Sequence, residues 1–390
     1  MHSSGNHPHC DHRTSGKLVM DNPANLLRVF QYLTAEHSAS LYNPEARVSQ
    51  ESYMQKLWAL TEITKRFQSN APIPETLVQM CFQMLMHLLL DDSFVSEETP
   101  KWKQQEICYV LVKILIKQHG TVVQSLIDSI VVEKLIARFA TPNLKERELL
   151  VYIVHASYEE FIQLRVTIRK AIGDRFLMAQ LGQGGISELL FLMGCFVGGF
   201  RIPLREEHLE FFSHVMLPLY QVGLHDTDPL DACALQFVEK DAKLSEKVVE
   251  FLVNHWPDSN DESRKPCSQQ FFKSLTRFIP YLPNTDNQFN SMHFLLFAHI
   301  SKCLRVPQLA PAAVSLLCDC NLIPIIASNP LACNHLLYDP LYRIIIGTTD
   351  QMLAQKCTAL LAQLPRANSP DKAQALKYYN FTPALVHSLN

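Results

Sequence analysis

The sequence predicts an all-α protein, a HEAT-like (armadillo-type) helical-repeat solenoid, and three observations support this. Hydrophobic residues make up 47% of the 390-residue chain and charged residues 19%, a balance typical of folded proteins. Glycine accounts for only 12 residues, fewer than nucleotide-binding α/β folds or turn-rich β-sandwiches favour. Apolar stretches with helical periodicity recur in pairs, roughly 40 residues apart, the length of a HEAT or armadillo repeat.

The predicted helices follow one another from the N-terminal side. Stretches of this kind begin at Tyr53, Leu77, Ile107 and Glu188. In the segment from 106 to 117, Ile107, Leu111, Ile114 and Leu115 recur at helical spacing, whereas Lys113 and Lys117 occupy another face. This pattern predicts an amphipathic helix.

Prolines mark the breaks between the predicted helices, because proline can begin a helix but interrupts its interior. Examples are Pro72, Pro74, Pro142, Pro203, Pro257 and Pro280. We find no long low-complexity linker. We therefore expect a disordered polar tail at residues 1–21, a single repeat array at 22–365, and a C-terminal extension at 366–390 that is loosely packed or frayed.

Charge and cysteine content restrict the class of protein. The net charge of −3 and the pI of 6.6 provide no global basic field for binding nucleic acid or an anionic membrane. No apolar run reaches the length of about 18 residues expected of a membrane span, and the N-terminus lacks an apolar signal region. The 11 cysteines are scattered, several within apolar stretches, which favours a reducing compartment. We expect a cytoplasmic or nuclear location, or both.

Candidate catalytic and metal-binding motifs are weak. Cys318 and Cys320 lack the second ligand pair of a zinc site, and Gly182 to Gly185 lacks the lysine of a phosphate-binding loop. Histidines gather in the polar tail at His7, His9 and His12, where binding of metal would be adventitious. We expect no catalysis, no metal and no cofactor, although an enzyme that uses the scattered cysteines and histidines stays a remote alternative.

A stripe of polar and apolar residues points to peptide binding. His155, Tyr158, Ile162 and Arg165 are spaced so that one helix would hold them within a face roughly 80° wide. An imidazole, a phenol, an aliphatic group and a guanidinium suit an extended peptide with an aliphatic anchor and an acidic residue. The alternative is a buried polar network between neighbouring helices.

The same region resembles a known family. The resemblance is carried, in order, by Lys145–Leu150, His155, Tyr158, Leu164–Lys170, Gly185–Leu190, Gly199–Phe200, Pro203–His208, Leu217–Leu219, Gln236–Asp241 and Trp256–Pro257. In order and spacing these segments are similar to the B-prime family of regulatory subunits of serine/threonine protein phosphatase 2A. Weaker likeness reaches Trp102 on one side and Leu341–Arg343 on the other.

The resemblance implies a non-catalytic solenoid that binds a phosphatase scaffold subunit and a metal-dependent catalytic subunit. It also implies capture of substrate proteins through short Leu-x-x-Ile-x-Glu peptides in a groove. The matching groove positions are His155, Tyr158, Ile162, Arg165, Leu192, Phe196, Arg205 and His208. Asp91, Asp92, Glu97 and Glu98 form an acidic loop that resembles a longer family segment, and an ordinary solvated loop is the alternative.

Two departures from the family affect the expected peptide. Ala156 stands where the family has an arginine. The loss of this positive charge should make peptide binding less sensitive to phosphorylation of the peptide. Phe196 replaces a smaller aliphatic residue and changes the pocket volume, whereas Arg205 replaces a lysine and offers a bidentate fork to a carboxylate. A helical-repeat scaffold or transport adaptor that has lost phosphatase binding is the alternative function.

Overall fold

The structure, a computed structural model, describes residues 50–69, 72–90, 94–179, 184–224, 226–257, 265–282, 291–320, 322, 325 and 330–364. Every element in these ranges is helical, which confirms the all-α prediction. The chain divides into two compact units, Met1–Ala171 and Ile172–Asn390. The predicted tail at 1–21 and the extension at 366–390 lie outside the described residues.

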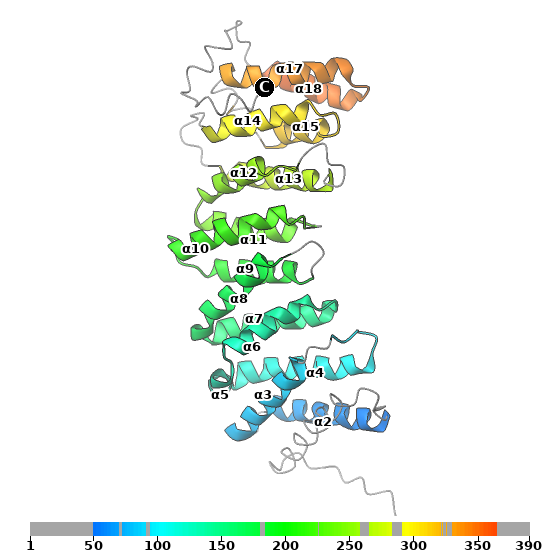
Figure 1. Ribbon diagram of the computed structural model, residues 1–390, viewed down its shortest axis with the longest axis vertical. Coiled ribbons are helices and arrows are strands. Elements are labelled where there is room, and N and C mark those ends of the chain that lie inside the picture. Colours follow the sequence, from blue (N-terminus) through cyan, green and yellow to red (C-terminus); the bar gives the residue numbers. More distant parts are fainter. Residues whose placement is uncertain are drawn as a thin grey trace, which may run out of the picture. The chain divides into compact units, whose positions relative to one another are not determined.

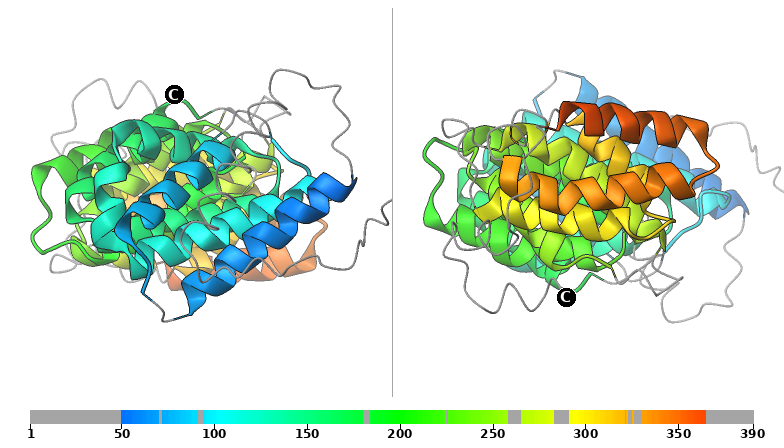
Figure 2. Two further views of the ribbon diagram at one scale, coloured as in Figure 1. Left: turned by 90° about the horizontal axis from the view of Figure 1, so that it is seen from below. Right: turned by 90° about the horizontal axis from the view of Figure 1, so that it is seen from above.

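In unit 1, three long helices lie side by side as one layer (Figures 1 and 2). They are α2 (Gln50–Gln68), α4 (Pro100–Gln118) and α7 (Leu144–Glu160). On α4 pack α3 (Glu75–Leu89) and the short α5 (Gly120–Val123), which is followed by η1 (Gln124–Leu126), α6 (Ser129–Ala137) and η2 (Arg138–Ala140). This two-layer arrangement of helix pairs is typical of HEAT-like repeats.

Local sequence explains where the helices of unit 1 begin. The side chains of Asp128 and Asn143 accept hydrogen bonds from the backbone amides of Val131, at 2.8 Å, and Glu146, at 3.1 Å, so each caps the start of a helix. Pro100 begins α4, where its missing amide hydrogen is tolerated.

The amphipathic helix expected over residues 106–117 is confirmed as part of α4. Leu111 and Leu115 are fully buried, whereas Lys113 and Lys117 are exposed. The apolar stripe therefore faces the core of unit 1, as the periodicity predicts.

In unit 2, consecutive helices alternate between two layers, each helix contacting its neighbours along and across the layers (Figure 1). One layer holds α9 (Ile186–Gly198), α11 (Asp228–Lys240), α13 (Lys265–Phe278), α15 (Ala310–Asp319) and α18 (Gln351–Gln363). The other holds α10 (Glu206–Phe211) with its π-helical and 3₁₀ continuations η4 (Phe212–Met216) and η5 (Leu217–Gln221), then α12 (Leu244–Asn254), α14 (Ser291–Leu304) and α17 (Pro330–Gly347). The helix α8 (Arg165–Leu177) contains the division between the units, and η7 (Ile279–Tyr281) extends α13.

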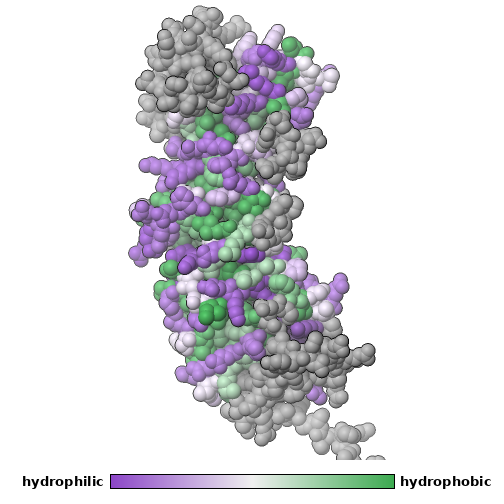
Figure 3. Space-filling view, viewed as in Figure 1, coloured by the Kyte–Doolittle hydropathy of each residue, from purple (hydrophilic) through white to green (hydrophobic). Residues whose placement is uncertain are grey.

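Prolines mostly fall at helix ends, as predicted. Pro74 precedes α3, and Pro280 lies in the 3₁₀ turn that ends α13. Pro340 is an exception, since it lies inside α17. The face seen in Figure 3 has polar side chains along the described helices, with apolar patches between them.

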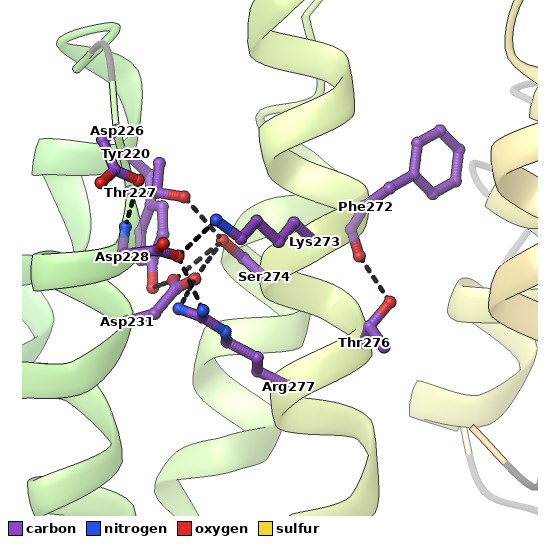
Figure 4. A network of polar contacts seen from close by, with 10 residues as sticks. All are labelled: Tyr220, Asp226, Thr227, Asp228, Asp231, Phe272, Lys273, Ser274, Thr276 and Arg277. Carbon is purple, nitrogen blue, oxygen red and sulfur yellow. Dashed lines mark hydrogen bonds and ion pairs between the residues drawn. The ribbon is translucent and has the colours of Figure 1, made fainter. Parts of the chain in front are cut away.

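Both units contain a fully buried carboxylate held by hydrogen bonds. In unit 1, Glu146 accepts hydrogen bonds from Tyr109 Oη (2.6 Å), Arg138 Nε (2.7 Å) and Thr141 Oγ1 (2.6 Å). In unit 2, Asp231 accepts from Tyr220 Oη (2.7 Å), Ser274 Oγ (2.8 Å) and an Arg277 terminal nitrogen (3.1 Å) (Figure 4). Both networks join helices that are neighbours in the fold.

Candidate functional site

The four residues of the predicted helical stripe do not lie on one helix. His155 and Tyr158 belong to the last turns of α7, which ends at Glu160, whereas Ile162 begins the 3₁₀ turn η3 (Ile162–Leu164) and Arg165 begins α8. The expected single helix is therefore wrong. At the break, Phe161 leaves the helical conformation with φ −114° and ψ 87°.

Packing of Phe161 accounts for the break. Its side chain is 1% exposed, and its ring lies 3.5 Å from the position that a Cβ on Gly120 would occupy. The Phe161 ring therefore packs at ordinary van der Waals distance from Gly120. Because neither glycine nor proline interrupts the local sequence, periodicity alone could not reveal the break.

Arg165 bridges the break and keeps two predicted site residues together. Its Nε donates to the carbonyl of Tyr158 at 2.8 Å and a terminal nitrogen donates to the carbonyl of Glu159 at 3.2 Å. The guanidinium also lies 5.3 Å from the centre of the Tyr158 ring, within cation–π range. Arg165 thus caps the C-terminal carbonyls of α7 and fixes the position of Tyr158.

Two further residues belong to this cluster and were not predicted. A terminal nitrogen of Arg169 donates to the Tyr158 hydroxyl at 3.1 Å. Val166, four positions after Ile162, is 63% exposed, and Ile162 is 72% exposed. The signal was in the sequence, since Arg169 follows Arg165 by four positions and Val166 follows Ile162 by four. We call Tyr158, Ile162, Arg165, Val166 and Arg169 the Tyr158 cluster.

His155 faces a different set of charges. Its Nδ1 lies 3.6 Å from a carboxylate oxygen of Glu159, which also pairs with Lys117 at 2.8 Å. The hydrogen bond that Lys117 donates to Glu159 lowers the pKa of that carboxyl group, and the hydrogen bonds that Lys117 donates to Glu159 and Glu160 raise the pKa of Lys117 itself. Ala156 is 3% exposed, so no charged group projects from that position.

In unit 2, Leu192 and Phe196 lie in the core rather than at the surface. Their exposed fractions are 0% and 3%, whereas their neighbour Phe191 is 61% exposed. The two buried side chains do share one face of α9, as their four-residue spacing indicates. This face packs within unit 2, beside α11.

Arg205 and His208 come together at the start of α10. Both lie near Glu207, with Arg205 Nη1 at 3.2 Å and His208 Nε2 at 3.3 Å from the same carboxylate oxygen. The His208 ring stacks on Phe200, with centroids 3.9 Å apart and planes 9° apart, and is largely buried. The Arg205 side chain is 72% exposed and is the accessible charge of this pair. That the residues of units 1 and 2 face each other across a groove stays a prediction.

Half of the predicted acidic loop lies within the described residues. The Glu97 carboxylate contacts Lys145 at the start of α7. It accepts a hydrogen bond from the Lys145 backbone amide at 3.3 Å and pairs with the Lys145 ammonium group at 3.4 Å. Glu98 is exposed, and Asp91 and Asp92 lie outside the described residues. The contacts of Glu97 anchor the segment before α4 to the start of α7.

The cysteines do not assemble into an obvious reactive site within the described part of the chain. Eight of them are free thiols, six buried and two exposed, and these residues include no group of three or more potential metal ligands. Cys303 Sγ lies 3.4 Å from His299 Nε2. Burial raises the pKa of Cys303 to about 12 and lowers that of His299 to about 4, the opposite of a thiolate–imidazolium pair. In the described ranges no helix combines the length and apolarity that a bilayer span requires.

Comparison with known proteins identifies the family of this chain. A family model described as protein phosphatase 2A regulatory B subunit (B56 family) matches residues 41–369, which is most of the chain and includes helices of both units. The chain belongs to the B56 family. The recognisable central segments are therefore part of a family-wide similarity, and the HEAT-like fold expected from the sequence is that of this family.

Among B56 relatives, the B' beta isoform of the 57 kDa regulatory subunit from Arabidopsis thaliana is 31% identical over 65% of this chain and 51% of its own length. The regulatory subunit pptr-1 of Caenorhabditis elegans is 26% identical over 84% of this chain and 64% of its own. The human 56 kDa delta isoform is 31% identical over 56% of this chain and 36% of its own. This B56 chain thus spans less than two thirds of each relative.

Proposed function

We propose that this B56 protein is a non-catalytic regulatory subunit of protein phosphatase 2A. In this function it binds the scaffold and catalytic subunits and brings substrate proteins to them. The family match over residues 41–369 carries the proposal, and the named relatives are themselves regulatory subunits of this phosphatase. We further propose that it acts in the cytoplasm, the nucleus or both.

Substrates would be recruited through short acidic peptides of the Leu-x-x-Ile-x-Glu type. The Tyr158 cluster supports this, because it combines two exposed aliphatic side chains, Ile162 and Val166, with the guanidinium groups of Arg165 and Arg169. Exposed apolar groups can bind an aliphatic anchor, and guanidinium groups pair with carboxylates. Arg205 adds an exposed positive charge on unit 2.

The preferred peptide should differ from that of the family in one respect. Ala156 lacks the positive charge that the family resemblance places there and is itself buried. A phosphate on the peptide would therefore gain less from this position than it would from an arginine. We expect weaker and less phosphorylation-dependent binding than the family norm.

Affinity purification from the native cell tests the phosphatase assignment. Tagged protein should recover both the scaffold and the catalytic subunits, identified by mass spectrometry. A stable set of other partners, without either phosphatase subunit in repeated experiments, would instead identify a scaffold or transport adaptor. Imaging of the tagged protein tests its location in the same cells.

Peptide titration tests the recruitment site independently. A labelled Leu-x-x-Ile-x-Glu peptide should bind the wild type saturably and bind Ile162→Glu roughly ten- to a hundredfold more weakly, the effect of losing one buried aliphatic contact. The matched control is Ile130→Glu, which alters an exposed isoleucine on α6 of the same unit. Binding that is equal in all three proteins, or absent from the wild type, rejects the site.

Arginine variants sharpen this test. Arg205→Ala should weaken binding roughly tenfold or more, because a charge-assisted hydrogen bond is lost from an exposed position. Arg165→Ala is harder to interpret, since Arg165 also donates to the carbonyls of Tyr158 and Glu159. Its effect on binding should be compared with its effect on hydrogen exchange at the end of α7.

A further inference from the structure

The last described helix pair, α17 and α18, exposes an apolar stripe. Tyr338, Tyr342 and Ile346 are 54%, 51% and 70% exposed, and their four-residue spacing places them along one side of α17. The two tyrosine rings stack with centroids 6.4 Å apart and planes 11° apart. We call these three residues the α17 stripe.

Each of the preceding helices α12 and α14 is covered by the next helix of the same layer. The helix α14 packs on α12, and α17 in turn packs on α14, where Ser301 Oγ donates to the carbonyl of Leu336 at 2.5 Å. The contacts of α17 bury Leu337 and Leu341, on a face separate from the stripe. No later element exists within the described residues to cover α17 in the same way.

A polar outer face is what the end of a helical array requires in water. The α17 stripe has the opposite character, since three large, half-exposed apolar side chains lie there beside the ion pair of Arg343 with Asp339 at 3.0 Å. Contiguous apolar surface of this kind usually marks a binding site. The α17 stripe is therefore a candidate docking surface.

We propose that residues 365–390 of this same chain bind to the α17 stripe. These residues follow α18 directly and contain seven large apolar side chains suited to such contact, at Leu376, Tyr378, Tyr379, Phe381, Leu385, Val386 and Leu389. The connection between α17 and α18 is only residues 348–350, so the two helices run antiparallel, as the orange and red helices on the right of Figure 2 show. The chain thus leaves α18 near the first turns of α17.

The distances fit this occupant. From Tyr338 to Ile346 the stripe is about 12 Å long at the helical rise per residue. A few extended residues, at about 3.3 Å each, are enough to reach it from Leu364, which leaves most of the segment for contact. A tethered segment also has a high effective concentration, so weak contacts are enough to hold it there. The inference does not depend on phosphatase binding.

Hydrogen exchange on the full chain tests the proposal with variants on both sides of the contact. Tyr342→Glu alters the stripe, Leu385→Glu with Leu389→Glu alters the segment, and Phe191→Glu is the control, an exposed aromatic of the same unit on α9. Both test variants should speed exchange in α17 about tenfold, and the combined variant should add little further, because either change alone breaks the same contact. The control should leave α17 unchanged.

Other outcomes overturn the proposal. Unchanged exchange in α17 with the segment variant, or effects that simply add, would mean that residues 365–390 do not cover the stripe. The molar mass of the full chain, measured by light scattering, tests the other possible occupant of the stripe, a second copy of the chain. A dimer that dissociates with Tyr342→Glu would assign the stripe to a second copy of the chain, whereas a monomer with coupled variants supports the intramolecular contact.

Discussion

The two buried carboxylates, Glu146 in unit 1 and Asp231 in unit 2, are held by the same set of groups. Each accepts hydrogen bonds from a tyrosine, from a serine or threonine hydroxyl, and from an arginine, and each is fully buried. A buried charge requires such partners. The two units thus hold a buried carboxylate with the same kinds of hydrogen-bond donor. They differ in the solvent exposure of the arginine.

The arginine of unit 1 is sealed, whereas that of unit 2 is open. Arg138 is only 5% exposed beside Glu146. The side chain of Arg277 is 34% exposed and is shared between Asp231 and the half-exposed Asp228, which also binds Lys273 at 2.6 Å. Removing the carboxylate should therefore leave a buried arginine without its carboxylate in unit 1, but a solvated arginine that still pairs with Asp228 in unit 2.

The largest expected effect comes from Glu146→Ala. It leaves the Arg138 guanidinium buried without this carboxylate and removes the acceptor of Tyr109 and Thr141. The free energy of unfolding of unit 1 should fall by about 3–5 kcal/mol, measured by urea titration and by hydrogen exchange in α4 and α7. The control Glu148→Ala, at an exposed position of α7, should change it by less than about 0.5 kcal/mol. Equal effects of the two substitutions would contradict the importance of the buried network.

A smaller effect is expected from Asp231→Ala. Arg277 keeps Asp228 at 2.7 Å and its access to water, so mainly the hydrogen bonds of Tyr220 and Ser274 are lost. Stability of unit 2 should fall by about 1–3 kcal/mol, read from exchange in α11 and α13, with Glu239→Ala on the exposed side of α11 as control. A loss as large as that of Glu146→Ala would show that exposure of the arginine does not decide the outcome.

The sequence predicted the helices well because each one depends on local signals. Periodicity located α4, and prolines such as Pro74 and Pro280 marked helix ends. The sequence-based prediction failed at Phe161, where α7 ends. The buried ring of this residue lies near Gly120, and periodicity cannot reveal a contact between residues far apart in sequence. Glu146 lay within a motif quoted for the family resemblance, yet its burial depends on Tyr109 and Arg138, which only the fold brings to it.

The candidate site was predicted in part for the same reason. Tyr158 and Arg165 do come together, but through a helix break and two carbonyl contacts instead of a shared helical face. Arg169 and Val166 were missed because the search stopped at the four stripe positions. Leu192 and Phe196 were placed on one face correctly, although a spacing rule cannot tell a buried face from an exposed pocket floor.

The pH dependence of stability should reveal the environment of Asp231 in the unit 2 network. Burial raises the pKa of Asp231 from 3.8 to about 6, against the hydrogen bonds of Tyr220 and Ser274, which lower it. The folded protein therefore binds this proton more tightly than the unfolded chain, and the contribution of Asp231 to stability increases as the pH falls through 6. Relative to Asp231→Asn, the wild type should gain about 1 kcal/mol between pH 7 and pH 5. A constant or opposite difference in urea titrations would contradict the raised pKa.

The smallest effect is expected from Lys273→Ala, which removes only the exposed edge of the unit 2 network. Lys273 and Asp228 are 49% and 41% exposed, so water and salt screen their attraction, and Asp228 retains Arg277 as a partner. The hydrogen bond from Lys273 does lower the pKa of Asp228, but stability from that source is lost only as the pH falls below the ordinary range of an aspartate, outside the interval from pH 7 to pH 5. The free energy of unfolding of unit 2 should therefore fall by less than about 0.5 kcal/mol. This loss should disappear in 1 M salt, where the Debye screening length shortens to about 3 Å. A loss above about 1.5 kcal/mol that persists in high salt would mean that Lys273 supports the buried Asp231 through Arg277, and the contrast between a sealed and an open network would then no longer hold.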